Sequence, residues 1–190
     1  MMPVQVMAMA APAAPVATDA ARDDAERLGA LFDRHHQRLY RLARRLCQGS
    51  DDARDVVQET FLRAARAPAS VPDGMPREEA WLVRVLINIC RDRWRMRASR
   101  TRLDPRGDAG LPLRSADPEA ALIARSLVWR ALDALPPRRR AMLVMYELDG
   151  ATIPAIARLL GVAPVTVRWH LARGRREMAA LVRGMQGDES

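Results

Sequence analysis

The sequence predicts an all-α protein made of two small helical domains joined by a flexible linker. Leu, Ala and Val dominate the apolar residues, and aromatic residues make up only 4% of the chain, which favours helices over strands. Apolar residues recur at helical spacing in two long stretches. The segment between them, residues 98–117, contains several Gly and Pro residues and little periodicity, so we expect it to be the linker.

The charge of the chain indicates a polyanionic partner. All 31 basic residues are Arg, and the formal net charge is +8. Arg carries a fixed charge and a planar fork suited to phosphates and to guanine edges. Residues 81–106 hold 8 Arg and 2 acidic residues, and residues 137–183 hold 9 Arg and 3, whereas residues 19–66 are nearly neutral. One polyanion contacted at two places, together with a protein partner, would explain this layout.

We expect the first domain to span residues 25–97, after a disordered N-terminal tail over residues 1–24. Its first helix is predicted from Leu28, where the apolar face continues through Leu31, Phe32, His35, Leu39, Leu42 and Leu46. Gly49 then breaks the pattern. Ser50 is predicted to cap the next helix, because a Ser side chain can accept hydrogen bonds from the free amides of a first turn.

Two further helices complete this domain. The second is expected from about Asp51 to Ala67, with its inner face formed by Val56, Val57, Thr60, Phe61 and Ala64. Pro and Gly residues over 68–76 predict a loop. The third helix is expected to begin near Glu78 and to end near Arg97. Its predicted inner face is Trp81, Leu82, Val85, Leu86, Ile89 and Cys90.

The second domain is predicted over residues 118–183, before a short tail at 184–190. Asp117 is expected to cap a helix whose apolar face is Ala121, Ala124, Leu127, Val128, Ala131 and Leu135. Pro136 and Pro137 stop that helix. Since proline is well accommodated in a first helical turn, a new helix can start there and run to about Leu148. Two short helices follow, hinged at Gly161.

The last two helices match a helix-turn-helix pattern. Thr152 is placed to cap the first helix, and Gly161 is placed where a left-handed backbone is needed. Ile156, Leu160, Val167 and Leu171 are expected to form the wedge between the helices, above the small Ala157. A basic second helix at this spacing favours DNA binding over an ordinary helical hairpin. The residues expected to contact DNA are Pro164, Val165, Thr166, Arg168, Trp169 and Arg173.

Other classes of protein are disfavoured. Cys47 and Cys90 lie in apolar stretches and are interpreted as reduced core thiols. No CxxC pair or His/Cys cluster suggests zinc, and no nucleophile elbow or P-loop suggests an enzyme. No apolar run reaches the ~20 residues of a membrane span, and residues 1–21 make a poor signal peptide. We expect a cytoplasmic, non-enzymatic protein without cofactor, metal, membrane insertion or small-molecule substrate.

Two stretches resemble a known family. Within residues 31–97, "LFDRHHQRLYRLARRL", "DDARDVVQETFLRA" and "AWLVRVLINICRDRWR" resemble the three helices of sigma factor region two. Residues 135–178, "LPPRRRAMLVMYELDGATIPAIARLLGVAPVTVRWHLARGRREM", resemble region four. Only a linker separates the two, an arrangement that is similar to the extracytoplasmic-function (ECF) subgroup of bacterial RNA polymerase sigma factors.

The resemblance implies a protein that binds RNA polymerase core and promoter DNA and is controlled by an anti-sigma factor. It implies that polymerase docks on the acidic helix through Asp55, Gln58, Glu59 and Phe61. It also implies that the loop around residues 67–79 forms a pocket for a flipped base. The third helix would hold the opened downstream promoter element through Asn88, Arg91, Trp94 and Arg95. The helix-turn-helix would read the upstream element.

Alternatives stay open at this stage. A helix-turn-helix is shared by many regulators, so the chain could be a transcriptional repressor or a response-regulator-type DNA-binding protein, although neither needs the acidic helix within residues 51–97. The acidic stripe could also be a solvated helix face or, less favoured, a carboxylate metal site. Ile153-Pro154-Ala155, Trp169 and His170 depart from the family pattern. These departures concern the promoter sequence that is recognised rather than the fold, and we assign His170 no catalytic or metal role.

Overall fold

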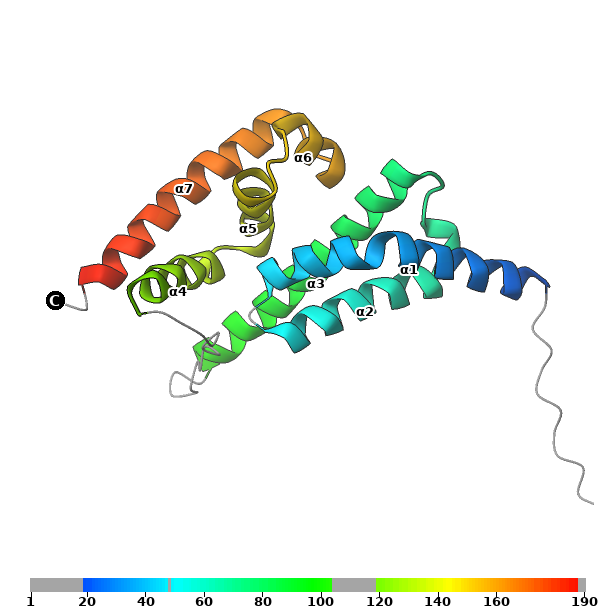
Figure 1. The fold of residues 1–190 in the computed structure, drawn as a ribbon, viewed down its shortest axis with the longest axis horizontal. Coiled ribbons are helices and arrows are strands. Elements are labelled where there is room, and N and C mark those ends of the chain that lie inside the picture. The colour runs from blue at the N-terminus through cyan, green and yellow to red at the C-terminus, as the bar shows by residue number, and fades with distance from the viewer. Residues whose placement is uncertain (1–18, 48, 104–118, 188–190) are drawn as a thin grey trace, which may run out of the picture.

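The computed structural model describes residues 19–47, 49–103 and 119–187, and every regular element among them is helical (Figure 1). The first domain consists of α1 (Asp19–Leu46), α2 (Ser50–Arg66), the 3₁₀ turn η1 (Pro68–Ser70) and α3 (Met75–Leu103). The second consists of α4 (Glu119–Ala134), α5 (Pro137–Leu143), the π-helical turn η2 (Val144–Leu148), α6 (Ile153–Leu160) and α7 (Pro164–Gly187). The predicted all-α fold with two helical domains is confirmed. None of the described helices combines the length and apolarity needed to cross a bilayer.

The three long helices of the first domain enclose an apolar core. The inner face predicted for α2 is confirmed, because all five of its residues are buried: Val56, Val57, Thr60, Phe61 and Ala64. Leu82, Leu86, Ile89 and Cys90 of α3 are buried as predicted, while Trp81 and Val85 are half-buried at its edge. The periodicity of the apolar residues therefore identified the right faces for these helices.

The boundaries of these helices differ from those predicted. α1 begins at Asp19, so residues 19–24 of the expected tail are helical. Gly49, in an extended conformation, precedes the first turn of α2, and Ser50 is the first helical residue instead of the cap. α3 begins at Met75 because Pro76 fits in a first turn. It continues to Leu103, into the expected linker, because no Gly or Pro interrupts the chain before Pro105. The rest of that linker, 104–117, lies outside the described residues, as do the helix cap expected at Asp117 and residues 1–18.

The second domain contains the helix-turn-helix in the predicted form. The Thr152 hydroxyl accepts a hydrogen bond from the Ala155 amide, and Gly161 has a left-handed backbone with φ 64°. The predicted wedge is confirmed, because Ile156, Leu160, Val167 and Leu171 are all buried. α7 is longer than expected, with 24 residues. It crosses close to α5 at Gly174, where a Cβ would lie 2.7 Å from Leu143 Cδ1.

The apolar face predicted for α4 is only partly correct. Leu127, Ala131 and Leu135 are buried, but Val128 is 46% exposed. α4 packs mainly against α7, so only the side of α4 that faces α7 and α5 is covered. The side chains of Ala121 and Ala124 lie outside the described residues.

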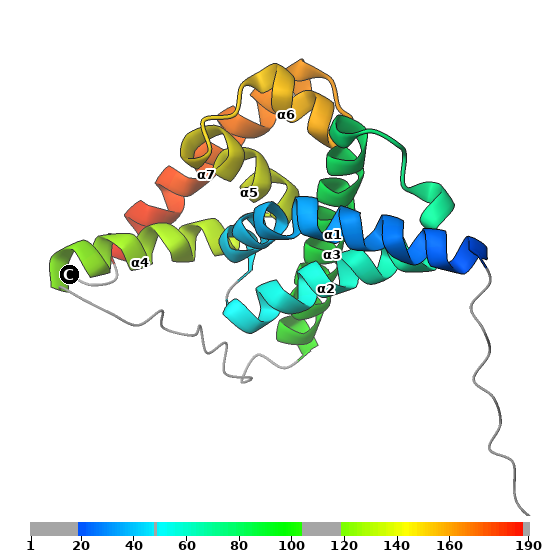
Figure 2. The ribbon, with the colours of Figure 1, turned by 45° about the vertical axis from the view of Figure 1, so that its right-hand side comes forward.

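The two domains pack against each other along α3, which contacts α1 and α2 of its own domain and α5 and α6 of the other. Figure 2 shows α6 beside the N-terminal end of α3. Val83 and Ile87 of α3 are buried although neither belongs to the predicted inner face. Helical spacing places them opposite Val85 and Ile89, and Val83 lines a cavity with Met145 and Ile156 of the second domain. α3 is therefore covered on two sides.

Candidate polymerase and nucleic-acid interfaces

The predicted polymerase-binding residues lie on α2, which exposes one acidic side. Asp55 and Gln58 are exposed. Glu59 is half-buried and pairs with Arg63 at 3.1 Å and with Arg66 at 3.9 Å. Both arginines lie in the last turn of the same helix. These pairs therefore hold the Glu59 carboxylate in place without removing it from solvent. The exposed side of α2 is thus available to a basic partner.

Phe61 does not share that exposed side. Its side chain is only 6% exposed, and its ring packs against Phe32 of α1 with centroids 4.9 Å apart. The apolar surface beside the acids is instead formed by Phe32 and Leu62, which are 42% and 40% exposed. They line a cavity of about 600 Å³ between α1 and α2, together with Gln58 and His36. The sequence placed Phe32 in the core, because its position fits the apolar period of α1.

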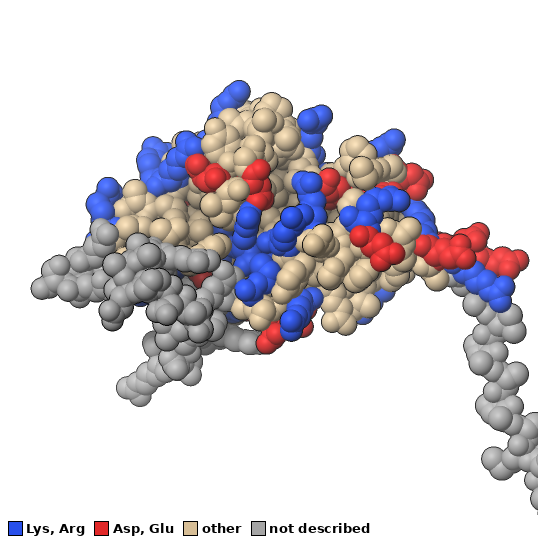
Figure 3. Space-filling view, viewed as in Figure 1, with Lys and Arg blue, Asp and Glu red and all other residues tan. Residues whose placement is uncertain are grey.

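The predicted DNA contacts of α3 divide between two faces. Asn88, Arg91 and Arg95 are exposed, and their spacing puts them on one side of the helix. The same spacing continues upstream through the exposed Arg77 and the half-buried Arg84, which sequence reasoning missed; their seven-residue separation was the available signal. These five residues form what we call the α3 basic stripe. Figure 3 shows that Arg side chains also gather across the middle of the face on view, where α1 crosses in front of α3 in Figure 1.

Trp94 lies on the other face. It is half-buried and lines a cavity of about 190 Å³ with Cys90 and Arg140, at the junction of the two domains. It therefore does not continue the α3 basic stripe in this arrangement of the domains.

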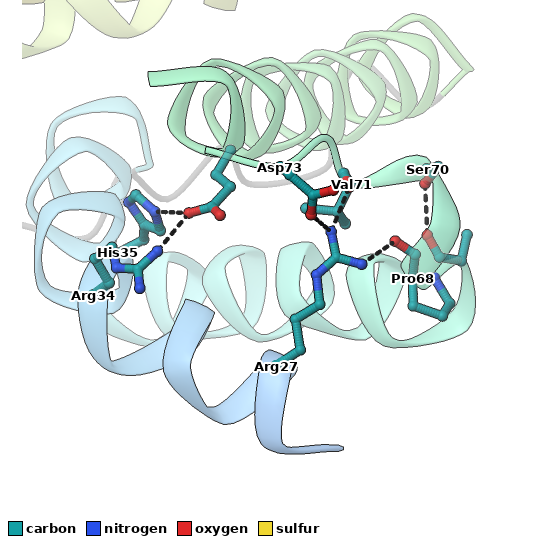
Figure 4. Close-up of polar contacts among 9 residues, drawn as sticks. Arg27, Arg34, His35, Pro68, Ser70, Val71 and Asp73 are labelled. Carbon is teal, nitrogen blue, oxygen red and sulfur yellow. Dashed lines mark hydrogen bonds and ion pairs between the residues drawn. The ribbon is translucent and has the colours of Figure 1, made fainter. Parts of the chain in front are cut away.

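The loop before α3 is fastened to α1. Arg27 donates to the carbonyl oxygen of Val71 at 2.8 Å and to the carboxylate of Asp73 at 2.7 Å (Figure 4). A third contact, to the Pro68 carbonyl, is 3.4 Å long. One guanidinium thus joins three points of the loop, which fixes the loop relative to the helix.

The start of α3 is fastened to α1 as well. Glu78 accepts hydrogen bonds from Arg34 at 2.8 Å and from the His35 ring at 3.3 Å (Figure 4). Burial opposes ionisation of Glu78, but the hydrogen bonds from His35 and Arg34 together lower its pKa below the ordinary value. The loop that the resemblance assigned to base capture is therefore held at both ends.

The N-terminal half of α7 presents the predicted recognition surface. Val165 and Trp169 are 66% and 51% exposed, and Pro164 and Arg168 are exposed as well. Arg173 lies over the Trp169 ring at 5.6 Å and pairs with Glu177 at 2.9 Å. Thr166 is half-buried. All six predicted contacts are on this helix, and five of them are exposed.

His170 lies beside that surface, with its ring edge-on to the Trp169 ring and the two centroids 4.8 Å apart. Its side chain is half-buried, and burial, reinforced by the positive charges of Arg139 and Arg138, lowers its pKa below the ordinary value. A lowered pKa favours the neutral form of the ring at pH 7. No cluster of potential metal ligands occurs among the described residues.

Both halves of the chain match family models. Residues 31–100 match Sigma-70 region 2, and residues 125–178 match Sigma-70 region 4. The chain is 36% identical over 172 residues to the ECF RNA polymerase sigma factor SigM of Mycobacterium tuberculosis, covering 85% of each protein. The chain belongs to the ECF sigma factors. The sigma factor interpretation of the sequence is thereby confirmed, and the repressor and response-regulator alternatives are not supported.

Other relatives agree with this assignment. The ECF sigma factor SigE of Mycolicibacterium smegmatis is 35% identical over 153 residues, covering 78% of this sigma factor and 58% of the relative. CnrH, solved in complex with the cytosolic domain of CnrY, is 28% identical with a TM-score of 0.55, covering 87% and 95% of the two chains. RpoE, solved with the anti-sigma factor NepR from Bartonella quintana, shares the fold, with 21% identity and a TM-score of 0.58. The match covers 85% of this chain and 98% of RpoE. As a sigma factor, the protein is a non-enzymatic initiation factor that acts with RNA polymerase on promoter DNA.

Proposed function

We propose that this sigma factor divides promoter recognition among three surfaces. The acidic side of α2 binds the polymerase core, the α3 basic stripe holds the opened downstream promoter element, and the N-terminal half of α7 reads the upstream element. The observation that carries the proposal is the α3 basic stripe, because Arg77, Asn88, Arg91 and Arg95 are exposed on one face of a long helix and the half-buried Arg84 lies in line with them.

The α3 basic stripe suits a single DNA strand. Arginines spaced along one helix face provide a track for successive phosphates, and Asn88 adds a side chain that can donate to and accept from a base edge. A base removed from the duplex also needs a rigid pocket. The loop fastened by Arg27 leads into the N-terminal end of α3, near the start of the α3 basic stripe. This loop is the candidate for that pocket.

Recognition of the upstream element suits the start of α7. A recognition helix enters the major groove with its N-terminal residues toward the bases. Val165 offers an apolar contact for a thymine methyl group, and Arg168 offers the fork that pairs with guanine. Arg173, one and a half turns later, is placed for a phosphate.

Two further features of the function are part of this proposal. The protein works in the cytoplasm, because RNA polymerase core and chromosomal DNA are there. It is also held in check by an anti-sigma factor. Support comes from CnrH and RpoE, two similar proteins that were both solved in complexes, the second with an anti-sigma factor by name.

Reconstituted transcription tests the proposal. The full chain is mixed with RNA polymerase core from its own organism and offered a genomic promoter library. We expect transcripts that start at a small set of sites sharing an upstream and a downstream element, and none from core alone. Transcripts whose start sites share no sequence element would contradict the proposal, as would equal output with and without the chain.

A further inference from the structure

The two cysteines of the chain meet beside the contact between the domains. Cys47 follows the last residue of α1 and Cys90 lies in α3, yet their sulfur atoms are 4.0 Å apart. Cys47 is half-buried and Cys90 is buried. The chain contains no other cysteine. An intramolecular reaction between the two therefore has no competing thiol within the chain.

The surroundings of the pair favour oxidation chemistry. A cavity of about 190 Å³ opens onto both cysteines and is lined by Arg93 and Arg140, so a small oxidant can reach the sulfur atoms. The hydrogen bond from Cys90 lowers the pKa of Cys47, aided by the charges of Arg93 and Arg140, against the opposing effects of burial and Asp52. The same hydrogen bond and burial raise the pKa of Cys90. The opposite directions of these two pKa shifts favour Cys47 as the nucleophile and Cys90 as the proton-bearing partner.

Cys47 is also connected to the second domain through its own backbone. The peptide that joins Leu46 to Cys47 presents the Leu46 carbonyl oxygen to Arg140, which donates to it at 2.6 Å. Closing a disulfide requires the sulfur atoms to approach to about 2.05 Å. Cys47 lies just past the end of α1, where its amide donates to the Ala43 carbonyl at 2.8 Å, whereas Cys90 is in the middle of a helix, so we expect Cys47 to make most of the approach. That movement shifts the peptide to which Arg140 is bound.

We propose that Cys47 and Cys90 are a hydroperoxide-reactive dithiol whose oxidation to a disulfide loosens the attachment of Arg140 and so separates the two domains. The Cys47 thiolate attacks the peroxide, a sulfur–oxygen bond forms as the oxygen–oxygen bond breaks, and the departing hydroxide takes a proton to become water. The Cys90 thiol then attacks the Cys47 sulfenic acid, the sulfur–sulfur bond forms and a second water leaves. Two thiols are oxidised by two electrons, and one hydroperoxide is reduced.

Oxidation also changes the charge at Cys47, and this change weakens the attachment of Arg140 as the movement does. In its ionised form, Cys47 places a negative charge beside two guanidinium groups, one of which, Arg140, is buried. A disulfide is always neutral, so oxidation removes the favourable interaction that the ionised form makes with a buried cation. A dithiol that is reduced in the resting cytoplasm and oxidised transiently is the usual form of a cytosolic redox sensor.

The first experiment measures the chemistry on the full chain. After limited hydrogen peroxide, we expect intact mass spectrometry to show the loss of two hydrogens and thiol counting to fall from two to none, reversed by dithiothreitol. The Cys90→Ala variant should accumulate a sulfenic acid at Cys47, which dimedone captures. In the Cys47→Ser variant, dimedone should capture no sulfenic acid at Cys90. Alkylation of Cys47 should exceed that of Cys90 by at least about tenfold, because reactivity follows the thiolate fraction. Retention of both thiols, or disulfides only between chains, would overturn the proposal.

The second experiment measures the consequence by small-angle scattering and hydrogen exchange. On oxidation of the wild type, the radius of gyration of the whole chain should rise, and so should the rate of amide hydrogen exchange in α5. Arg140→Gln should show both changes while reduced, and Arg138→Gln, an exposed arginine on the same helix, should show neither. Peroxide-treated Cys47→Ser controls for oxidation of the ten methionines and should remain compact. An oxidised wild type with an unchanged radius and unchanged exchange would refute the coupling between the disulfide and the domain contact.

Discussion

Arg140 of the second domain donates a hydrogen bond to the carbonyl oxygen of Leu46 in the first, at 2.6 Å, with its side chain only 4% exposed. The same guanidinium donates to the carboxylate of Asp133 at 2.7 Å. An Arg is rarely buried without a partner, and here it satisfies acceptors from both domains at once. Arg45 of α1 forms a second link by pairing with Asp149.

Arg140→Met should weaken the contact between the domains. The substitution keeps the apolar stem but leaves Asp133 and the Leu46 carbonyl without this donor, so we expect a loss of about 2–4 kcal/mol in the free energy of unfolding. Urea denaturation measures that loss. Arg138→Met, exposed on the same helix, is the matched control and should change stability by less than ~0.5 kcal/mol. Equal stability of the two variants would show that the buried pair contributes nothing.

Reversing the charge of α2 should impair binding to polymerase. In Asp55→Arg with Glu59→Arg, two carboxylates on the exposed side become cations, and like-charge contact with a basic partner costs several kcal/mol. We expect co-elution with core to be lost while circular dichroism is unchanged. Asp23→Arg with Glu26→Arg makes the same charge change at the exposed start of α1 and should still co-elute. If both double variants bind core equally, α2 is not the docking surface.

Replacing arginines of α7 should separate base contacts from phosphate contacts. Arg168→Ala should cost ~1–3 kcal/mol and relax the sequence preference at one position of the upstream element. Arg173→Ala should weaken binding to all DNA sequences alike and should lower the salt dependence of that binding. Fluorescence anisotropy with holoenzyme and upstream-element duplexes measures both, and Arg183→Ala near the far end of α7 is the control. Unchanged affinity in both variants would exclude this helix from the DNA.

Variants of the α3 basic stripe should bind core but fail to hold open DNA. Asn88→Ala, and Arg91→Ala with Arg95→Ala, are expected to co-elute with core and to lose thymine reactivity to permanganate near the start site, because the single strand loses its contacts. Arg84→Ala extends the test to a residue that sequence reasoning missed. Arg130→Ala with Arg183→Ala removes two charges elsewhere and should melt the promoter normally. Full melting by every α3 variant would remove this face from the mechanism.

Two glycines of α7 should respond oppositely to alanine. At Gly174, a Cβ would meet Leu143 Cδ1 at 2.7 Å and Arg139 Cγ at 3.2 Å, so Gly174→Ala should destabilise the fold by about 1–3 kcal/mol through overpacking. At Gly184, no atom lies within 4 Å of the added group, and Gly184→Ala should stabilise the helix by roughly 0.5–1 kcal/mol. Thermal unfolding of both variants checks the pair. A stabilised Gly174→Ala would mean that α5 and α7 are less closely packed than described.

The sequence was sufficient wherever a feature depends on neighbours along the chain. The inner face of α2 followed from helical periodicity alone. The helix-turn-helix followed from Thr152 as a cap and Gly161 as a left-handed residue, two roles that a few adjacent residues determine. The helix boundaries were less predictable, as at the start of α2 at Ser50 and the end of α3 at Leu103. A weak stop signal does not fix where a helix ends, because the residues that follow can continue the helix.

What covers each surface was decided only by the tertiary structure. Arg138, Arg139 and Arg140 are chemically identical in the sequence, yet they are exposed, half-buried and buried in turn. Likewise, Phe32 and Phe61 both fit the apolar period, and only the packing of α1 on α2 makes the first exposed and the second buried. Periodicity reports which side of a helix is apolar, but not which distant element lies against it. For the same reason the sequence placed Cys47 and Cys90 only in two separate apolar stretches, and the packing of α1 against α3 brings their sulfur atoms together beside Arg140.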